Sequence, residues 1–216
     1  MRTRIKICGC TSITDVEGAV EAGADAVGVI LAESPRRVSL ADARTVARSV
    51  PPFVAVVGVM VNPDPELVAA VLALGAVPQF SGDESPEFCA AVAGARYVKA
   101  LHFERYLVHT AADAEAAADR YPEADLLFDS RSAGLYGGTG KTFNWPLVEG
   151  VARRRRIIMS GGLVPANVAA CVRTVRPFAV DVRSGVETHG AKDQAKMRAF
   201  VEAVRAGDED TTRAET

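Results

Sequence analysis

Two short, largely apolar segments of the chain end in side chains that can give or accept a proton. Residues 5–8 read Ile-Lys-Ile-Cys and residues 126–129 read Leu-Leu-Phe-Asp, so Cys8 and Asp129 each close such a segment. Short apolar runs of this kind are candidates for buried strands. A thiol and a carboxyl group that face each other suit acid–base work on one carbon skeleton, which points to proton transfer between neighbouring carbons.

Two glycine-containing turns could bind a phosphate group. One is Ser160-Gly161-Gly162 and the other is Ser184-Gly185, and each follows an apolar segment late in the chain. Glycine lets backbone N–H groups approach the phosphate oxygens, and a helix N-terminus adds further donors. Ordinary turn glycines are the alternative interpretation.

The loop 130–143 is rich in glycine and ends in Gly-Lys-Thr-Phe, but it is not a nucleotide-binding P-loop. That motif needs a glycine five residues before Gly140, and residue 135 is a leucine. The sequence therefore argues against ATP or GTP binding. It leaves open that backbone N–H groups of this loop contact an anion.

Eight short apolar segments alternate with alanine-rich segments of helical periodicity. Successive apolar segments begin 20 to 31 residues apart, which suits parallel strands joined by helical crossovers. Eight such units over residues 1–206 predict a single-domain α/β fold, the (β/α)8 or TIM barrel. An open doubly wound sheet is the alternative, but no GxGxxG follows the first segment. The predicted strands are 5–8, 26–31, 55–61, 77–80, 97–101, 126–129, 157–160 and 178–182, and the predicted helices are 15–22, 40–49, 65–74, 86–93, 111–120, 145–152, 166–173 and 194–205.

Alternation along barrel strands would bring several polar side chains into the interior. If Cys8 points inward, so does Lys6, and the same parity places Gln79, Lys99 and Asp181 inside. Lys6 could then supply the positive charge that lowers the pKa of the Cys8 thiol. Interior ion pairs without a ligand are the alternative, because buried polar groups must be paired in some way.

The composition of the chain argues against several classes of binding partner. The formal net charge of -2 and the lack of a basic face predict no nucleic-acid partner. The sequence has no apolar run near the roughly 20 residues of a membrane span, and no signal-peptide pattern. Four cysteines without framework spacing suggest a reducing cytoplasm, and their pattern predicts no metal site. We expect a cytoplasmic monomer or homodimer that binds a small molecule, with a disordered tail over residues 207–216.

Several motifs, in one order along residues 4 to about 205, resemble those of the phosphoribosylanthranilate isomerase family. The resemblance implies a (β/α)8 barrel that uses no cofactor or metal. It also implies an Amadori rearrangement of N-(5'-phosphoribosyl)anthranilate in tryptophan biosynthesis. The motifs that carry it are Lys6-Ile7-Cys8-Gly9, Ser34-Pro35-Arg36, Gly82-Asp83-Glu84-Ser85-Pro86, residues 137–143, Ser160-Gly161-Gly162-Leu163 and Ser184-Gly185-Val186-Glu187.

The same resemblance assigns roles to individual residues. Asp129 would be the general acid that opens the ribose ring, and Cys8 the general base that takes the C2' proton. Arg36 would hold the anthranilate carboxylate. We expect further substrate contacts from Gln79, Gly140 and Asp181, and phosphate contacts from Gly161, Gly162, Ser184 and Gly185.

Several positions depart from the family pattern. Ser81 stands where the family usually has histidine, and Arg183 where it has a small residue. Cys10 replaces an aliphatic residue, Pro78 is unusual within its strand, and His102 is unusual after the fifth strand. These departures keep two alternatives open. One is a related isomerase that acts on a different aminoaldose phosphate in specialised metabolism. The other is a non-catalytic barrel that binds a phosphosugar.

Overall fold

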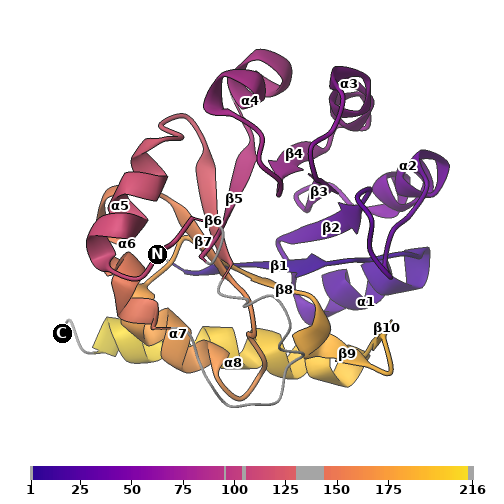
Figure 1. Ribbon diagram of the computed structural model, residues 1–216. Helices are drawn as coiled ribbons and strands as arrows, with labels where there is room; N and C mark the ends of the chain where they lie inside the picture. Colours follow the sequence, from indigo (N-terminus) through magenta and orange to yellow (C-terminus); the bar gives the residue numbers. More distant parts are fainter. Residues whose placement is uncertain (1, 95, 104–105, 130–143, 214–216) are drawn as a thin grey trace.

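A ring of parallel strands surrounded by helices forms the molecule, as the computed structural model shows (Figure 1). The structure describes residues 2–94, 96–103, 106–129 and 144–213. Within these residues, eight strands close into a barrel in chain order, each paired with the next and β8 paired with β1. This confirms the predicted (β/α)8 barrel. The strands are β1 (Arg4–Cys8), β2 (Ala26–Ile30), β3 (Ala55–Met60), β4 (Val77–Phe80), β5 (Val98–His102), β6 (Asp125–Asp129), β7 (Ile157–Ser160) and β8 (Ala179–Val182).

Helices follow the strands and begin at side chains that cap them. Ser39, Asp64 and Ser85 accept hydrogen bonds from the first turns of α2, α3 and α4. A small antiparallel hairpin of β9 (Glu187–Thr188) and β10 (Ala191–Lys192) follows the last barrel strand. The helices are α1 (Ile13–Ala22), α2 (Leu40–Ser49), α3 (Pro65–Ala73), α4 (Pro86–Ala93), α5 (Ala111–Asp119), α6 (Glu149–Arg154), α7 (Val168–Val175) and α8 (Gln194–Arg213), with the 3-10 turns η1 (Trp145–Val148) and η2 (Ser184–Val186).

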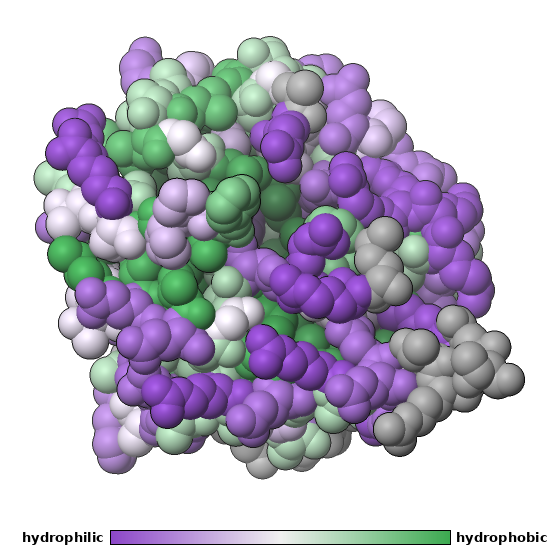
Figure 2. Space-filling view, turned by 180° about the vertical axis from the view of Figure 1, so that it is seen from behind, coloured by the Kyte–Doolittle hydropathy of each residue, from purple (hydrophilic) through white to green (hydrophobic). Residues whose placement is uncertain are grey.

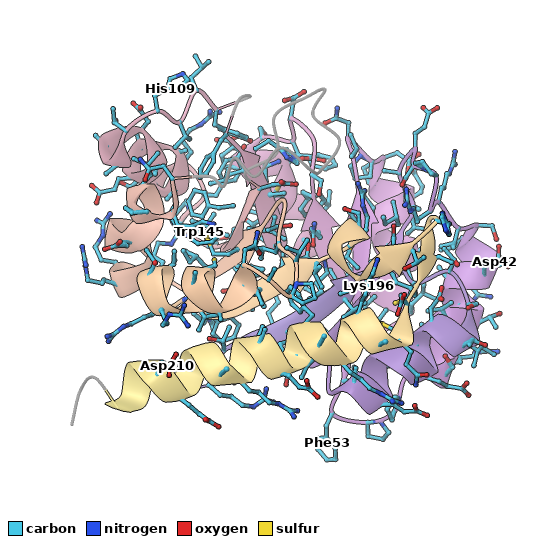
Figure 3. The ribbon with its side chains drawn as sticks, turned by 90° about the horizontal axis from the view of Figure 1, so that it is seen from below. Asp42, Phe53, His109, Trp145, Lys196 and Asp210 are labelled. Atoms are coloured by element: carbon cyan, nitrogen blue, oxygen red, sulfur yellow. The ribbon has the colours of Figure 1, made fainter. Side chains whose placement is uncertain are left out.

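Residues 207–213 do not form the predicted tail, because they continue helix α8, which crosses the view in Figure 3 as one long helix. Asp208 on this helix accepts hydrogen bonds from the backbone N–H (2.9 Å) and the hydroxyl (2.7 Å) of Thr3. These bonds join the two ends of the chain across the fold. In the part of the chain that the structure describes, no helix is long and apolar enough to cross a membrane.

Lys99 was predicted to point into the barrel, and the structure shows that it points outward. Val98 and Ala100 belong to a buried cluster with Leu127 inside the barrel, so the residue between them points outward. The Lys99 ammonium is fully buried, and it donates to Glu84 Oε2 (2.6 Å) and to the Gly82 carbonyl (2.8 Å). The outward position is tolerated because this carboxylate neutralises the charge.

This buried ion pair predicts a large effect on stability. Lys99→Met should lower the free energy of unfolding by about 3–5 kcal/mol, because it leaves the Glu84 carboxylate buried without its cation. Urea denaturation followed by circular dichroism measures this change. Arg153→Ala is the control, since Arg153 forms an exposed pair with Glu149 and should change stability by less than about 1 kcal/mol. A loss as small as that control in Lys99→Met would contradict the assignment.

Candidate active site

A cavity of about 390 Å³ opens at the carboxyl ends of the barrel strands. In (β/α)8 barrels this is the end that carries the catalytic residues. Every barrel strand contributes to the wall, directly or through the loop after it. The wall includes Cys8, Ile30, Val59, Gln79, Ser81, Ala100, His102, Leu127, Asp129, Ser160, Gly161, Gly162, Asp181, Arg183, Ser184 and Gly185.

Cys8 lies at the end of β1 and is only 5% exposed. Burial raises the pKa of its thiol above the ordinary value; the Asp181 charge adds to this, and the positive charges of Lys6 and Lys192 oppose it without reversing it. Lys6 therefore lowers this pKa as predicted, but burial outweighs its charge and the net shift is upward. The thiolate needed for a base forms only as the pH rises.

Gly28 makes room for the Cys8 sulfur. The two residues are paired between β1 and β2, and a Cβ atom at Gly28 would lie 2.8 Å from Cys8 Sγ and 3.1 Å from Lys6 Cε. Both distances are shorter than carbon atoms tolerate without a shift of their neighbours. A side chain here would thus displace the sulfur.

We therefore expect Gly28→Ala to lower kcat about 10-fold or more while the protein still folds, since small displacements of a reacting group are costly. The measurement is kcat together with the free energy of unfolding. Gly150→Ala on α6 is the control, because its Cβ would meet only the mobile end of the Glu115 side chain. Equal kcat values in the two variants would contradict a role for this space.

Lys6 holds two side chains that line the cavity, those of Gln79 and Asp181. Its ammonium donates to Asp181 Oδ1 (2.9 Å) and to Gln79 Oε1 (3.0 Å), and all three side chains are buried. Burial alone lowers the pKa of Lys6, but the charge of Asp181 and the neighbouring Cys8 outweigh it, so the pKa is raised. Lys6 therefore stays charged. The predicted interior group is present as a hydrogen-bonded network of these residues, without Lys99.

Asp129 ends β6 and lies on the same cavity wall as Cys8. Its Oδ2 lies 3.6 Å from Nδ1 of His102, the last residue of β5. The other ring nitrogen, Nε2, lies 3.1 Å from the carbonyl oxygen of Ser81. The sequence alone does not assign His102 to the site, although its position two residues after the inward-facing Ala100 indicates that it also faces inward.

The two glycine turns meet at one edge of the cavity. Gly161 and Gly162 have φ values of 82° and 65°, in the left-handed region that favours glycine. A Cβ at Gly185 would lie 1.9 Å from the Leu163 carbonyl oxygen, so only glycine allows the two turns to pack so closely. Ser184 lies on the same wall, so the predicted phosphate ligands are brought together.

The Arg36 side chain contacts the buried ion pair of Glu187 and Lys192, which the sequence did not predict. It follows Ser34 and Pro35, which line the cavity, and its guanidinium donates to Glu187 Oε2. Glu187 also accepts a hydrogen bond of 2.9 Å from Lys192, and both of these side chains are buried. The Arg36 Nε is buried, and no described residue accepts a hydrogen bond from it. One donor of Arg36 thus remains available to an acceptor.

Two further predictions concern the surroundings of the site. Gly140 lies outside the described residues. Arg183 lines the cavity, and Gly9, with φ of 76°, leaves room for it, since a Cβ there would lie 3.3 Å from Arg183 Cγ.

Among the described residues, no group of three or more His, Cys, Asp or Glu side chains could hold a metal ion.

Comparisons with known proteins all point to the same enzyme family. The family model described as N-(5'phosphoribosyl)anthranilate (PRA) isomerase matches residues 5–203. N-(5'-phosphoribosyl)anthranilate isomerase from Desulforudis audaxviator is 44% identical over 207 residues, covering 94% of this chain and 98% of the relative. The enzyme of the same name from Methylibium petroleiphilum is 49% identical and covers 96% of each chain.

Solved structures give the same result. Phosphoribosyl anthranilate isomerase from Thermotoga maritima superposes with a TM-score of 0.84 at 39% identity, covering 94% of this chain and 98% of the other. A complex of such an isomerase with reduced 1-(o-carboxyphenylamino)-1-deoxyribulose 5-phosphate gives a TM-score of 0.80 at 37% identity and the same coverage. A structure of monomers derived from the dimeric Thermotoga maritima isomerase gives 0.78 at 36% identity, again with the same coverage.

Proposed function

Because the chain belongs to the N-(5'-phosphoribosyl)anthranilate isomerase family, we propose that Cys8 and Asp129 carry the two proton transfers of its reaction. The reaction is the Amadori rearrangement of N-(5'-phosphoribosyl)anthranilate to 1-(2-carboxyphenylamino)-1-deoxyribulose 5-phosphate, in tryptophan biosynthesis. One observation carries the assignment. The thiol of β1 and the carboxyl group of β6 lie on the wall of one cavity, beside two glycine turns suited to phosphate.

Asp129 acts first, as a general acid. It gives a proton to the ribose ring oxygen O4' while the C1'–O4' bond breaks and its electrons go to that oxygen. The nitrogen lone pair of the substrate forms a double bond to C1', which leaves an iminium ion and a free C4' hydroxyl. Protonating the leaving oxygen lowers the barrier, since an alkoxide is a poor leaving group at neutral pH.

Cys8 acts second, as a general base. Its thiolate takes the C2' proton, the C2'–H electrons form a C1'=C2' bond, and the iminium nitrogen becomes neutral. The resulting enol loses its hydroxyl proton and gains one at C1', which gives the ketone. The positive charge of Lys6 favours the thiolate against the burial that disfavours it.

The remaining residues bind the substrate. Backbone N–H groups of the two glycine turns bind the phosphate, and Asp181 and Gln79, both hydrogen-bonded to Lys6, orient the sugar hydroxyls. Arg36 binds the anthranilate carboxylate through the donors that Glu187 does not use, and its Nε, which has no acceptor among the described residues, supports this role. Gly140 is proposed as a further backbone contact.

A fluorescence assay tests this function. The purified protein should abolish the fluorescence of N-(5'-phosphoribosyl)anthranilate as it forms product, and its gene should restore growth of a tryptophan auxotroph that lacks this isomerase. Turnover of another aminoaldose phosphate without rescue would favour an enzyme of specialised metabolism. Tight binding of the phosphosugar with no turnover would favour the non-catalytic barrel.

We also propose that the protein is a homodimer that uses the loop around Phe53. Phe53 is fully exposed (105%), has φ of 75°, and projects away from the molecule on the side opposite His109 in Figure 3. It lies before β3, at the end of the barrel away from the cavity. The face turned away in Figure 1 also gathers apolar side chains toward the side of α2 and α3 (Figure 2). A contiguous apolar patch is typical of a contact surface. The related isomerase from Thermotoga maritima is a dimer.

The dimer proposal predicts that Phe53→Ser yields a monomer, because the lost ring burial removes about 2 kcal/mol from each half of the contact. Light scattering after size exclusion, at micromolar concentration, measures the mass. Leu107→Ser, another exposed apolar residue, is the control and should leave the mass unchanged. A monomeric wild-type protein would contradict the proposal.

A further inference from the structure

Two departures from the family pattern lie in contact with each other. Ser81 replaces the histidine expected after β4, and His102 is the unusual residue at the end of β5. The His102 ring reaches Ser81 across the cavity wall, with Nε2 3.1 Å from its carbonyl oxygen. The site therefore keeps an imidazole near the position from which one is missing, supplied by the neighbouring strand.

The contacts of His102 fix which ring nitrogen carries hydrogen. A carbonyl oxygen only accepts hydrogen bonds, so Nε2 must be the donor that faces Ser81. Nδ1 is then the atom that gains or loses a proton, and it lies 3.6 Å from Asp129 Oδ2. His102 is thus oriented so that its exchangeable proton faces the proposed general acid.

We infer that His102 is a positioning residue that stores the proton which Asp129 delivers to the ribose ring oxygen. The inference rests on the proposed function and adds the source of that proton. The proton moves from Nδ1 to the carboxyl group and from there to O4' as the C1'–O4' bond breaks. Neutral His102 then recovers a proton from the solvent, which receives the proton that the enol hydroxyl releases.

The physical reason is the difference between the two groups in water. In water a carboxyl group has lost its proton at neutral pH, whereas an imidazole can still carry one. An imidazole beside the carboxylate can therefore supply it with a general-acid proton at neutral pH. Asp129, whose side chain is 19% exposed, does not then depend on burial for it.

Other charged or titratable groups also line the cavity. Among the described residues these are Cys8 on β1, Glu33 after β2, Asp181 on β8 and Arg183 directly after β8. Asp181 accepts hydrogen bonds from Lys6 (2.9 Å) and from Ser160 (3.4 Å), so its charge is already partnered. The titratable group paired with His102 is therefore Asp129.

His102→Gln tests the inference, because glutamine can still donate to the Ser81 carbonyl but cannot carry an exchangeable proton. We expect kcat/KM to fall about 10- to 100-fold at pH 7.5, and the loss to shrink about tenfold as the pH is lowered to 5.5, where a carboxyl group protonates unaided more often. His109→Gln makes the same replacement at an exposed histidine and should leave the profile unchanged.

Two outcomes would overturn the inference. One is a loss that is the same at every pH, which indicates a structural role. The other is a more than tenfold weaker binding of reduced 1-(o-carboxyphenylamino)-1-deoxyribulose 5-phosphate to His102→Gln, which indicates a substrate contact. Failure of the proposed function is distinguishable, since the wild-type protein would then not turn over N-(5'-phosphoribosyl)anthranilate.

Discussion

Cys8→Ala should lower kcat by at least about 100-fold, because no other group then takes the C2' proton from the iminium ion. Binding of the reduced product analogue should change little, since alanine removes only the sulfur. The fluorescence assay gives kcat, and a fluorescence titration gives the affinity. Cys171→Ala is the matched control, because Cys171 is buried on α7 away from the cavity. Full activity in Cys8→Ala would remove this residue from the mechanism.

The ionisation of Cys8 can be followed without turnover. Only the thiolate reacts with iodoacetamide. Because burial raises the pKa of Cys8, the alkylation rate should rise at a higher pH than it does for an ordinary thiol. Lys6→Met should move this rise to still higher pH, since the Lys6 charge lowers the pKa. A rise centred below that of a free thiol would contradict the structure.

Asp129→Asn should also lower kcat by at least about 100-fold, because an amide of the same shape cannot protonate the ring oxygen. The affinity for the reduced analogue should stay within a few-fold of wild type. Asp125→Asn, at the other end of the same strand, is the control. Its carboxylate pairs with Arg156 on the surface, and the variant should keep full activity. Equal activity in the two variants would contradict the assignment of Asp129 as the acid.

Local sequence patterns predicted the barrel and the placement of Cys8 and Asp129, the two proposed reacting groups, at one end of it. Apolar segments ending in Cys8 and Asp129 fix where β1 and β6 stop, and parallel strands present their ends at one face. The glycine turns after β7 and β8 followed from the same reasoning. These features depend on residues that are close in sequence, which is why the sequence reveals them.

Other features depend on contacts that join distant parts of the chain. The outward position of Lys99 needs the Glu84 carboxylate, and the last turns of α8 are held where Asp208 meets Thr3. The approach of His102 to Asp129 depends on the register of β5 against β6. The pKa of Cys8 reflects a balance of burial and charge, and sequence shows only the charges.

A crystal structure of this protein with reduced 1-(o-carboxyphenylamino)-1-deoxyribulose 5-phosphate would test the central claim most directly. The account predicts the phosphate on the two glycine turns, with C2' within about 3.5 Å of the Cys8 sulfur and the C4' oxygen within about 3.2 Å of the Asp129 carboxyl group. An analogue bound with its phosphate elsewhere would contradict the account. So would one with C2' turned away from Cys8 or the C4' oxygen turned away from Asp129.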